Sequence, residues 1–284
     1  MASSIPFTSR STADQVLAGI DLSRKRVVVT ECDSDVGFAT MKALNANGAR
    51  IVGLARTLDD AKAACSAVGR TVKPLGCDPL DAASVDAAVE TIDLSGPQDA
   101  VIANSVEQPS FADHVAQFVL VNRLAESVRP GTGRIVIGTH DANIKTTAGE
   151  AMFADLGDER IHDSQAFDGQ ATLATPLFAK ELSRRLQARG VAVNAFHSRE
   201  RRGVPRGLIQ TIARYFVRSP ARQAATPALL AVSPLVVGIS GEFWSNCRIS
   251  RGNPLFSDTG LARRLWDISA QLAAVTSGRA RSPL

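Results

Sequence analysis

Short runs of β-branched and aliphatic residues alternate along the chain with longer stretches whose apolar positions recur at helical spacing. This alternation is typical of βαβ units and predicts a parallel sheet covered by helices on both faces. The predicted strands are 26–30, 51–54, 72–75, 101–103, 134–137 and 191–196, and 234–239 leads into a last strand. The predicted helices are 37–46, 59–68, 81–92, 111–128, 167–188, 208–217, 220–232 and 258–273.

No internal repeat or low-complexity linker interrupts this series. We therefore predict one α/β domain, a Rossmann-like doubly wound parallel sheet, over residues 21–276. Residues 1–20 are expected to form an N-terminal arm and residues 277–284 a tail. Residues 140–165 are polar and have weak periodicity, and an Arg-rich loop follows the strand at 191–196.

The composition is that of a globular protein, and it gives no indication of a nucleic-acid or membrane partner. Hydrophobic residues make up 45% of the 284 residues, charged residues 21% and aromatic residues 5%, with a formal net charge of +4. No Lys/Arg run is interleaved with aromatic residues, so no nucleic-acid partner is expected. No apolar run reaches ~18 residues, and the first ten residues lack the apolar core of a signal peptide. We expect a cytoplasmic protein with no membrane partner.

The cysteines give no sign of a metal site or a disulfide framework. None of the four has C-x-x-C spacing or stands at short ligand spacing from a histidine: Cys32, Cys65, Cys77 and Cys247. We expect free thiols in a reducing compartment and no metal.

Over roughly residues 17–275 the order and spacing of these elements resemble the short-chain dehydrogenase/reductase superfamily, and within it the retinol-dehydrogenase-like branch. The segments that carry the resemblance are Gly19–Leu22, Leu177–Leu186, Gly241–Trp244 and Leu265–Ser269. The resemblance implies the Rossmann-like fold and self-association through the helices at 111–128 and 167–188. The partner would be a second copy or a homologous subunit.

The glycine-rich loop of that family is altered in this chain. The family's first strand ends in Thr-Gly-x-x-x-Gly-x-Gly, whose glycines let the backbone approach a pyrophosphate at a helix N-terminus. Here Glu31 and Asp35 stand at two glycine places, Asp33 lies between them, and Gly37 alone remains. Each carboxylate within ~4 Å of a phosphate charge costs about 4 kcal/mol at an effective dielectric of ~20. We therefore expect no cofactor, or NADP if any. The candidate positions are Arg56, Asp78 and Asn104, which match family cofactor contacts.

The family's Asn-Ser-Tyr-Lys catalytic tetrad is also replaced. Alignment on flanking residues puts Asp113 in the Asn place, His140 in the Ser place, Asp168 in the Tyr place and Thr172 in the Lys place. Phe167 is one position from the Tyr place, and Tyr215, the one tyrosine of the chain, lies far downstream. Hydride transfer by the family mechanism is not expected.

The substituted residues suggest other chemistry. An imidazole beside a carboxylate is a general acid–base pair, so we expect His140 and Asp168 to catalyse an isomerisation, cyclisation or elimination. Asp113 would be a second carboxylate. The substrate would be a hydrophobic small metabolite bound by Phe167, Thr172, Arg199 and Arg201. Two alternatives stay open: an inactive partner subunit, and an atypical NADP-dependent oxidoreductase with Asp168 as proton donor.

Overall fold

The computed structural model describes residues 5–104, 111–139, 164–197, 219–250 and 254–277, with the backbone alone for 111, 164–172 and 276–277. Within these ranges the chain forms one eight-stranded sheet in the order β3-β2-β1-β4-β5-β6-β7-β8. The strands are β1 (Arg26–Val29), β2 (Arg50–Ala55), β3 (Val72–Gly76), β4 (Ala100–Ala103), β5 (Arg134–Thr139), β6 (Ala192–His197), β7 (Phe243–Ser245) and β8 (Arg248–Ile249). All neighbouring strands are parallel except β7 and β8. The predicted single-domain, doubly wound α/β fold is confirmed.

The strand order reverses between β1 and β4. The chain builds β1, β2 and β3 outward in one direction, then returns to place β4 on the other side of β1. In open α/β sheets the crevice at such a reversal, outside the carboxyl ends of the strands, is the usual place for a ligand. The topology therefore points to the loops after β1 and β4.

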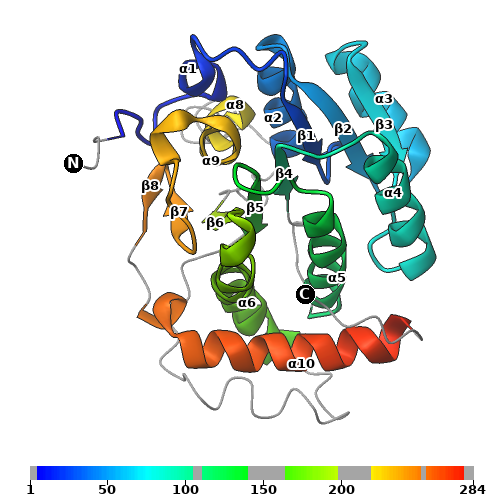
Figure 1. Cartoon of the computed structure of the whole chain (residues 1–284), viewed down its shortest axis with the longest axis vertical. Helices are drawn as coiled ribbons and strands as arrows, with labels where there is room; N and C mark the ends of the chain where they lie inside the picture. The colour runs from blue at the N-terminus through cyan, green and yellow to red at the C-terminus, as the bar shows by residue number, and fades with distance from the viewer. Residues whose placement is uncertain (1–4, 105–110, 140–163, 198–218, 251–253, 278–284) are drawn as a thin grey trace, which may run out of the picture.

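Helices cover both faces of the sheet (Figure 1). One face carries α1 (Ala13–Leu17), α2 (Asp35–Ala46), α3 (Leu58–Val68), α8 (Pro220–Gln223) and α9 (Ala225–Val232). The other carries α4 (Ala82–Leu94), α5 (Phe111–Glu126), α6 (Ser164–Arg185) and α10 (Thr259–Ser277). Alternate residues of β1 enter the two cores, with Val27 and Val29 in one and Val28 in the other. This explains why the strands read as continuous apolar runs.

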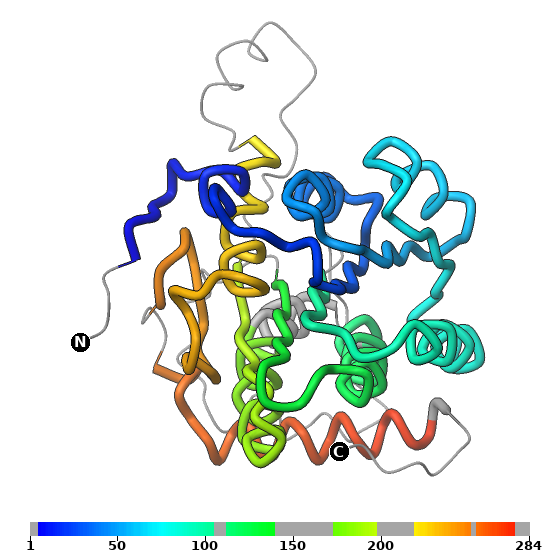
Figure 2. The backbone as a smooth tube through the Cα atoms, turned by 45° about the horizontal axis from the view of Figure 1, so that its top comes forward, coloured from blue at the N-terminus to red at the C-terminus, as the bar shows by residue number. Residues whose placement is uncertain are grey.

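The C-terminal helix α10 lies across α5 and α6 (Figures 1 and 2). Trp266 of α10 is 3% exposed. Its ring centroid lies 4.9 Å from that of Phe118 on α5 and 5.8 Å from that of Phe178 on α6. The guanidinium of Arg185 lies 4.1 Å from the centroid of the same ring. The predicted self-association through α5 and α6 stays untested, but α10 covers part of both helices.

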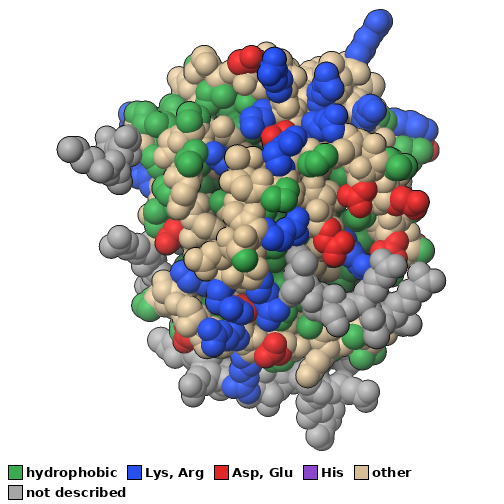
Figure 3. Space-filling view, in the orientation of Figure 1, with side chains coloured by type: hydrophobic (Ala, Val, Ile, Leu, Met, Phe, Trp, Pro, Cys, Tyr) green, Lys and Arg blue, Asp and Glu red, His purple; other side chains and the backbone are tan. Residues whose placement is uncertain are grey.

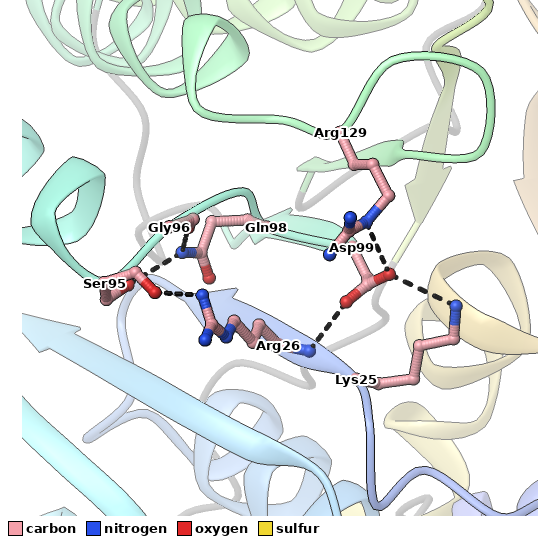
Figure 4. Close-up of polar contacts among 7 residues, drawn as sticks. All are labelled: Lys25, Arg26, Ser95, Gly96, Gln98, Asp99 and Arg129. Carbon is pink, nitrogen blue, oxygen red and sulfur yellow. Dashed lines mark hydrogen bonds and ion pairs between the residues drawn. The ribbon is translucent and has the colours of Figure 1, made fainter.

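A buried carboxylate joins three segments at the amino-terminal edge of the sheet (Figure 4). Asp99 precedes β4, and its side chain is 8% exposed. It accepts hydrogen bonds from Lys25 Nζ at 3.2 Å, from the Arg26 backbone N–H at 3.0 Å and from Arg129 Nε at 3.2 Å. Asp99 thereby fixes the starts of β1 and β4 relative to the segment that leads into β5.

Most predicted elements are present with boundaries shifted by a few residues. Side-chain caps set the start of three helices, because the oxygens of Ser34, Thr57 and Asp81 accept hydrogen bonds from first-turn N–H groups. The first two of these helices begin one or two residues earlier than predicted, and the third begins one residue later. The predicted helix at 220–232 is divided into α8 and α9. The predicted helix at 208–217 lies outside the described residues.

The chain ends and the last strands differ from the sequence expectation. Within the predicted arm, α1 is held by a capping box and buries Ala13, Val16 and Leu17 in the core; the division at residues 20 and 276 stays a prediction. Instead of leading directly into a strand, 234–239 begins with the 3₁₀ turn η3 (Pro234–Val236), because Ser233 caps it. The β7–β8 hairpin was not predicted. Two further 3₁₀ turns are η2 (Gln187–Arg189) and η4 (Pro254–Ser257).

None of the helices in the described ranges has the length and apolarity needed to cross a bilayer. The four cysteines are free thiols, and all four are buried, which the sequence did not predict.

Candidate active site

A small cavity of about 50 Å³ lies at the strand-order reversal, outside the carboxyl ends of β1 to β4. It is lined from the sheet by Thr30, Glu31, Leu54, Ala55, Cys77, Pro79, Ala103 and Asn104, and from the helices by Asp113, His114, Ala116, Gln117, Leu120 and Thr175. The cavity therefore joins the altered loop after β1 to the first turns of α5 and to α6.

The loop after β1 keeps a tight turn although two of its glycines are absent. Glu31 adopts a left-handed conformation, with φ of 48°, that favours glycine. Ser34 Oγ donates to the Glu31 carbonyl at 2.7 Å and accepts from the Gly37 backbone N–H at 3.0 Å. A Cβ on Gly37 would lie 2.0 Å from the Glu31 carbonyl oxygen. Gly37 is therefore required for packing, whether or not a phosphate binds.

Glu31 is the carboxylate of this loop that lines the cavity. Burial raises the pKa of the Glu31 carboxyl, the negative charges of Asp33 and Asp113 raise it further, and Arg56 opposes them. Asp33 and Asp35 are exposed, so the predicted row of three carboxylates contributes one side chain to the cavity. The protonated form of Glu31 is favoured relative to a carboxyl in water.

Asn104 connects β1 to the segment after β4. Its Nδ2 donates to the Thr30 carbonyl at 2.8 Å. The Asn104 carbonyl accepts from Thr30 Oγ1 at 3.5 Å and from Gln117 Nε2 at 3.4 Å. The residue is 8% exposed, and its Oδ1 has no hydrogen-bond partner in the described structure. The sequence indicated Asn104 as a remnant of a cofactor site; the structure gives it a bridging role and a buried, unsatisfied acceptor.

The first turn of α5 adds an acidic residue and a histidine. Asp113, the expected second carboxylate, lines the cavity close enough to raise the pKa of Glu31, and its catalytic role stays a prediction. His114 is 4% exposed, and its Nε2 lies 3.0 Å from Ser269 Oγ of α10. Burial lowers the pKa of His114 to about 4, so the imidazole is neutral near pH 7. Sequence analysis missed His114 as a cavity residue, although its position beside Asp113 was a usable signal.

The cysteines near the cavity are not activated thiolates. Cys32, directly after Glu31, is buried beside Cys65, and the hydrogen bond that it donates to the Cys65 sulfur, together with burial, raises the pKa of Cys32. Burial raises the pKa of Cys77 to about 12, with contributions from the charges of Asp78 and Glu31. Both thiols are therefore protonated and unsuited to nucleophilic catalysis.

The other predicted residues fall into three groups. Arg56 is exposed but lies close enough to affect the pKa of Glu31. The Asp78 carboxylate accepts a hydrogen bond from the Leu80 N–H at 3.1 Å, so it shapes the turn after β3. Those whose side chains lie outside the described structure are Phe167, Asp168 and Thr172 on α6, together with His140, Arg199 and Arg201. Their catalytic and binding roles stay predictions.

A larger cavity of about 820 Å³ lies at the opposite, amino-terminal edge of the sheet. Its charged side chains are tied to the fold. Arg134 donates to the carbonyls of Leu230 and Ser233 at 3.2 and 2.7 Å, and Glu181 is paired with Arg184 at 2.7 Å.

Lys and Arg side chains gather on the visible surface over α6, and Asp and Glu side chains over α4 (Figure 3). Among the described residues no group of His, Cys, Asp and Glu is arranged to hold a metal ion.

The sequence relatives described next are dehydrogenases by name. No family model matches the chain. Short-chain dehydrogenase TIC 32 B, chloroplastic, of Brassica napus is 25% identical over 302 aligned residues, covering 94% of this chain and 94% of that protein. Retinol dehydrogenase 13 of Homo sapiens is 28% identical over 289 residues, covering 90% of this chain and 87% of that protein.

A solved structure extends the likeness to three dimensions. The NADPH-bound structure of a short-chain oxidoreductase from Pseudomonas aeruginosa PAO1, which contains an atypical catalytic center, has a TM-score of 0.60 at 19% identity. The match covers 82% of this chain and 99% of that one. At that identity the likeness establishes the fold alone. The chain is thus similar in sequence to proteins named as a short-chain dehydrogenase and a retinol dehydrogenase, and it shares the fold of a solved short-chain oxidoreductase.

Proposed function

We propose that this chain has lost dinucleotide-dependent hydride transfer and catalyses a cofactor-independent acid–base reaction on a small metabolite. The observation that carries the proposal is the Glu31 carboxyl, which stands at a glycine place of the family loop and lines the same cavity as Asp113. Retinol dehydrogenases among the relatives support the retinol-dehydrogenase-like branch as its origin.

The residues around the cavity do not fit a dinucleotide. A pyrophosphate at the N-terminus of α2 would meet the side chain of Glu31 and the negative charge of Asp33, and a repulsion between two unit charges costs about 4 kcal/mol at ~4 Å and an effective dielectric of ~20. The first turn of α2 already carries Asp35, which complements the helix dipole. The cavity volume of about 50 Å³ suits a small polar group.

The two carboxyl groups suit proton transfer. A pair of carboxyls whose environments separate their affinities for protons can supply a general acid and a base. Burial and the negative charges of Asp33 and Asp113 favour the protonated form of Glu31, so we assign Glu31 as the acid and Asp113 as the second carboxyl of the pair. Such a group contributes ~10²–10⁴-fold to a proton transfer.

The predicted pair of His140 and Asp168 remains part of the proposal. By helical spacing, position 168 lies two turns before Thr175, the α6 residue that lines the cavity. Position 140 directly follows β5, whose carboxyl end faces the same edge of the sheet as the loops after β1 and β4. These backbone positions support a site shared with Glu31 and Asp113.

A second candidate is an atypical NADP-dependent oxidoreductase with Asp168 as proton donor. The Pseudomonas oxidoreductase favours it, because a protein of this fold with an atypical catalytic center was solved with NADPH bound. This candidate requires the Glu31 side chain to move out of the space that the pyrophosphate of the cofactor would occupy.

Calorimetric titration with NADPH and NADH separates the two candidates. We expect no heat and no thermal stabilisation at millimolar cofactor for the wild-type protein. Glu31→Gly, which restores a family glycine, and Glu31→Gln, which keeps the side-chain volume, serve as paired variants. Micromolar binding to the wild-type protein would overturn the proposal.

The acid–base activity is tested without a known substrate by incubating small carbonyl metabolites with the protein in D₂O. We expect protein-dependent C–H exchange, seen by NMR, that Glu31→Gln and Asp113→Asn each abolish. If no compound exchanges and a homologous subunit co-purifies, the chain is the inactive partner subunit instead.

A further inference from the structure

The larger cavity, at the amino-terminal edge of the sheet, is lined by cations from both faces of the sheet. Arg134 is the first residue of β5 and lies toward α9, because its Nη1 donates to the carbonyls of Leu230 and Ser233. Lys180 belongs to α6 on the other face, and its Nζ donates to the Gly241 carbonyl at 3.4 Å. The two cations therefore line one cavity from opposite sides of the strand ends.

The carboxylates that line this cavity are already paired with other residues. Asp99 contacts Lys25 Nζ and Arg129 Nε, each at 3.2 Å (Figure 4). Glu181 contacts two arginines one turn later on α6, at 2.7 and 2.9 Å. Each carboxylate is thus shared between two cations, so neither is left to neutralise a further positive charge.

Arg134 and Lys180 have no carboxylate partner among the described residues. Their hydrogen bonds go to backbone carbonyls, which satisfy N–H donors but carry no net charge. Burial lowers the pKa of the Arg134 guanidinium, as is expected of a cation that is partly removed from water without a compensating anion. In the described structure both of its hydrogen bonds come from Nη1, so Nε and Nη2 remain as donors for a ligand.

We propose that this cavity binds a small metabolite with two anionic groups, one held by Nε and Nη2 of Arg134 and the other by Lys180. The planar edge of a guanidinium matches the two oxygens of a carboxylate or phosphate, and an ammonium pairs with either group as a point charge. The cavity volume of about 820 Å³ lies within the ~300–1,000 Å³ typical of small-molecule sites.

This inference is independent of the proposed function, because the two cavities lie at opposite edges of the sheet. The ligand would bind away from Glu31 and Asp113. By joining β5, α6 and the segment after α9, it should stabilise the folded protein, since a ligand that binds the folded state alone raises stability. Failure of either proposal leaves the other intact.

The test uses the linear dicarboxylates from malonate to adipate as probes and acetate as the matched control, with calorimetry and thermal shift at constant ionic strength near neutral pH. We expect one chain length, the one that matches the separation of the two cations, to bind most tightly and to raise Tm. Acetate at twice the concentration should do neither. Inorganic pyrophosphate is the second probe, and binding of pyrophosphate alone would support the inference and identify phosphate as the anionic group.

Equal effects of acetate and all the dicarboxylates would show general charge screening and overturn the inference. Binding of none of the dicarboxylates or pyrophosphate would overturn it as well.

Variants locate the binding. Lys180→Gln should weaken binding of the best probe ~10-fold or more, because it removes a hydrogen bond between charged groups, whereas Lys180→Arg should retain most of the affinity. Lys73→Gln removes an exposed lysine of β3, at the other end of the sheet, and should leave binding unchanged. Unchanged affinity in Lys180→Gln would overturn the inference.

Arg134→Gln should also weaken binding. Because Arg134 also holds two carbonyls, urea unfolding must first show that this variant is folded at the temperature of the titration. If it does not fold, the Lys180 variants decide the outcome.

Discussion

Glu31 combines an unusual backbone conformation with an unusual charge. A left-handed conformation costs a non-glycine residue about 1–2 kcal/mol, and Glu31 adopts it at φ 48°. Its carboxyl is also half-buried near Asp33 and Asp113. The loop therefore retains the shape that glycine permits while it carries a side chain that glycine lacks.

The titration of Glu31 should be visible in the pH dependence of stability. Because its pKa is raised from 4.5 in the folded protein, the folded state holds this proton when the unfolded chain has lost it. Its stabilising contribution is present below pH 4.5 and is lost as pH rises through the folded pKa. Glu31→Gln should gain stability relative to the wild-type protein between pH 4 and pH 8, measured by urea unfolding. Asp35→Asn is the control, and a loss of stability in Glu31→Gln at pH 8 would contradict the assignment.

Gly53 illustrates a residue fixed by close packing. A Cβ at this β2 position would lie 2.7 Å from Cys65 Sγ and 2.9 Å from Met41 Sδ. Gly53→Ala should therefore destabilise the protein by ~1–3 kcal/mol through overpacking, measured by denaturant unfolding. Gly260→Ala, in the first turn of α10, should be nearly neutral, because its added Cβ would lie 3.3 Å from Asp258 Oδ1 and meet no closer atom. Equal effects of the two substitutions would show that contact with the sulfur atoms is unimportant.

At the scale of elements, α10 secures the helical layer beside the site. Its Trp266 packs on α5 and α6, and its Ser269 bonds to His114 of the cavity. The α10 helix therefore positions the turn of α5 that carries Asp113.

Truncation of the Trp266 ring should destabilise the packing of α10 on α5 and α6. Trp266→Ala should cost about 3–5 kcal/mol, because the ring is buried against Phe118 and Phe178 and beneath Arg185. Trp266→Phe is the matched variant and should lose less than half as much. Thermal unfolding measures both. A loss below 1 kcal/mol in Trp266→Ala would show that α10 is not firmly docked.

At the scale of the whole molecule, two buried titratable side chains, Glu181 and His114, change stability in the same direction when the pH falls. Burial alone would raise the pKa of Glu181, but hydrogen bonds from Arg184 and Arg185 lower it. Its stabilising contribution is therefore lost as pH falls below 4.5. His114 acts at higher pH, because its pKa falls from 6.5 to about 4 on folding. As the pH falls, the unfolded chain binds these two protons before the folded protein does, so both groups lower the stability of the fold in acid, whereas Glu31 acts in the opposite direction.

His114 should account for most of the loss between pH 6.5 and pH 4. We expect ~3 kcal/mol from this residue over that range, since one pKa unit corresponds to about 1.4 kcal/mol. His114→Gln should flatten the curve, whereas Ser269→Ala should keep its slope and lower stability by ~1 kcal/mol at every pH. Urea unfolding across this range measures both variants. An unchanged slope in His114→Gln would exclude the imidazole as the cause.

The sequence by itself determined most of the helices and strands and the replacement of glycines in the loop after β1. Continuous apolar runs indicate buried strands, and apolar residues at helical spacing indicate helices with one buried face. Most strands and helices could therefore be placed within a few residues. Glu31 and Asp113 were identified as replacements by alignment with the family pattern. The short α1 helix and the β7–β8 hairpin escaped, because a few residues carry too little periodicity.

Only the tertiary structure decided which of these residues meet. The Asn104 amide is held by a carbonyl 74 positions earlier, and His114 bonds to a hydroxyl 155 positions later. The tertiary structure also distinguishes Glu31, which lines the cavity, from Asp33 and Asp35, which are exposed. Such contacts depend on strand order and helix docking, which arise from packing across the whole chain. Local pattern fixes the burial of a residue, and its neighbours across the cavity are set by the fold.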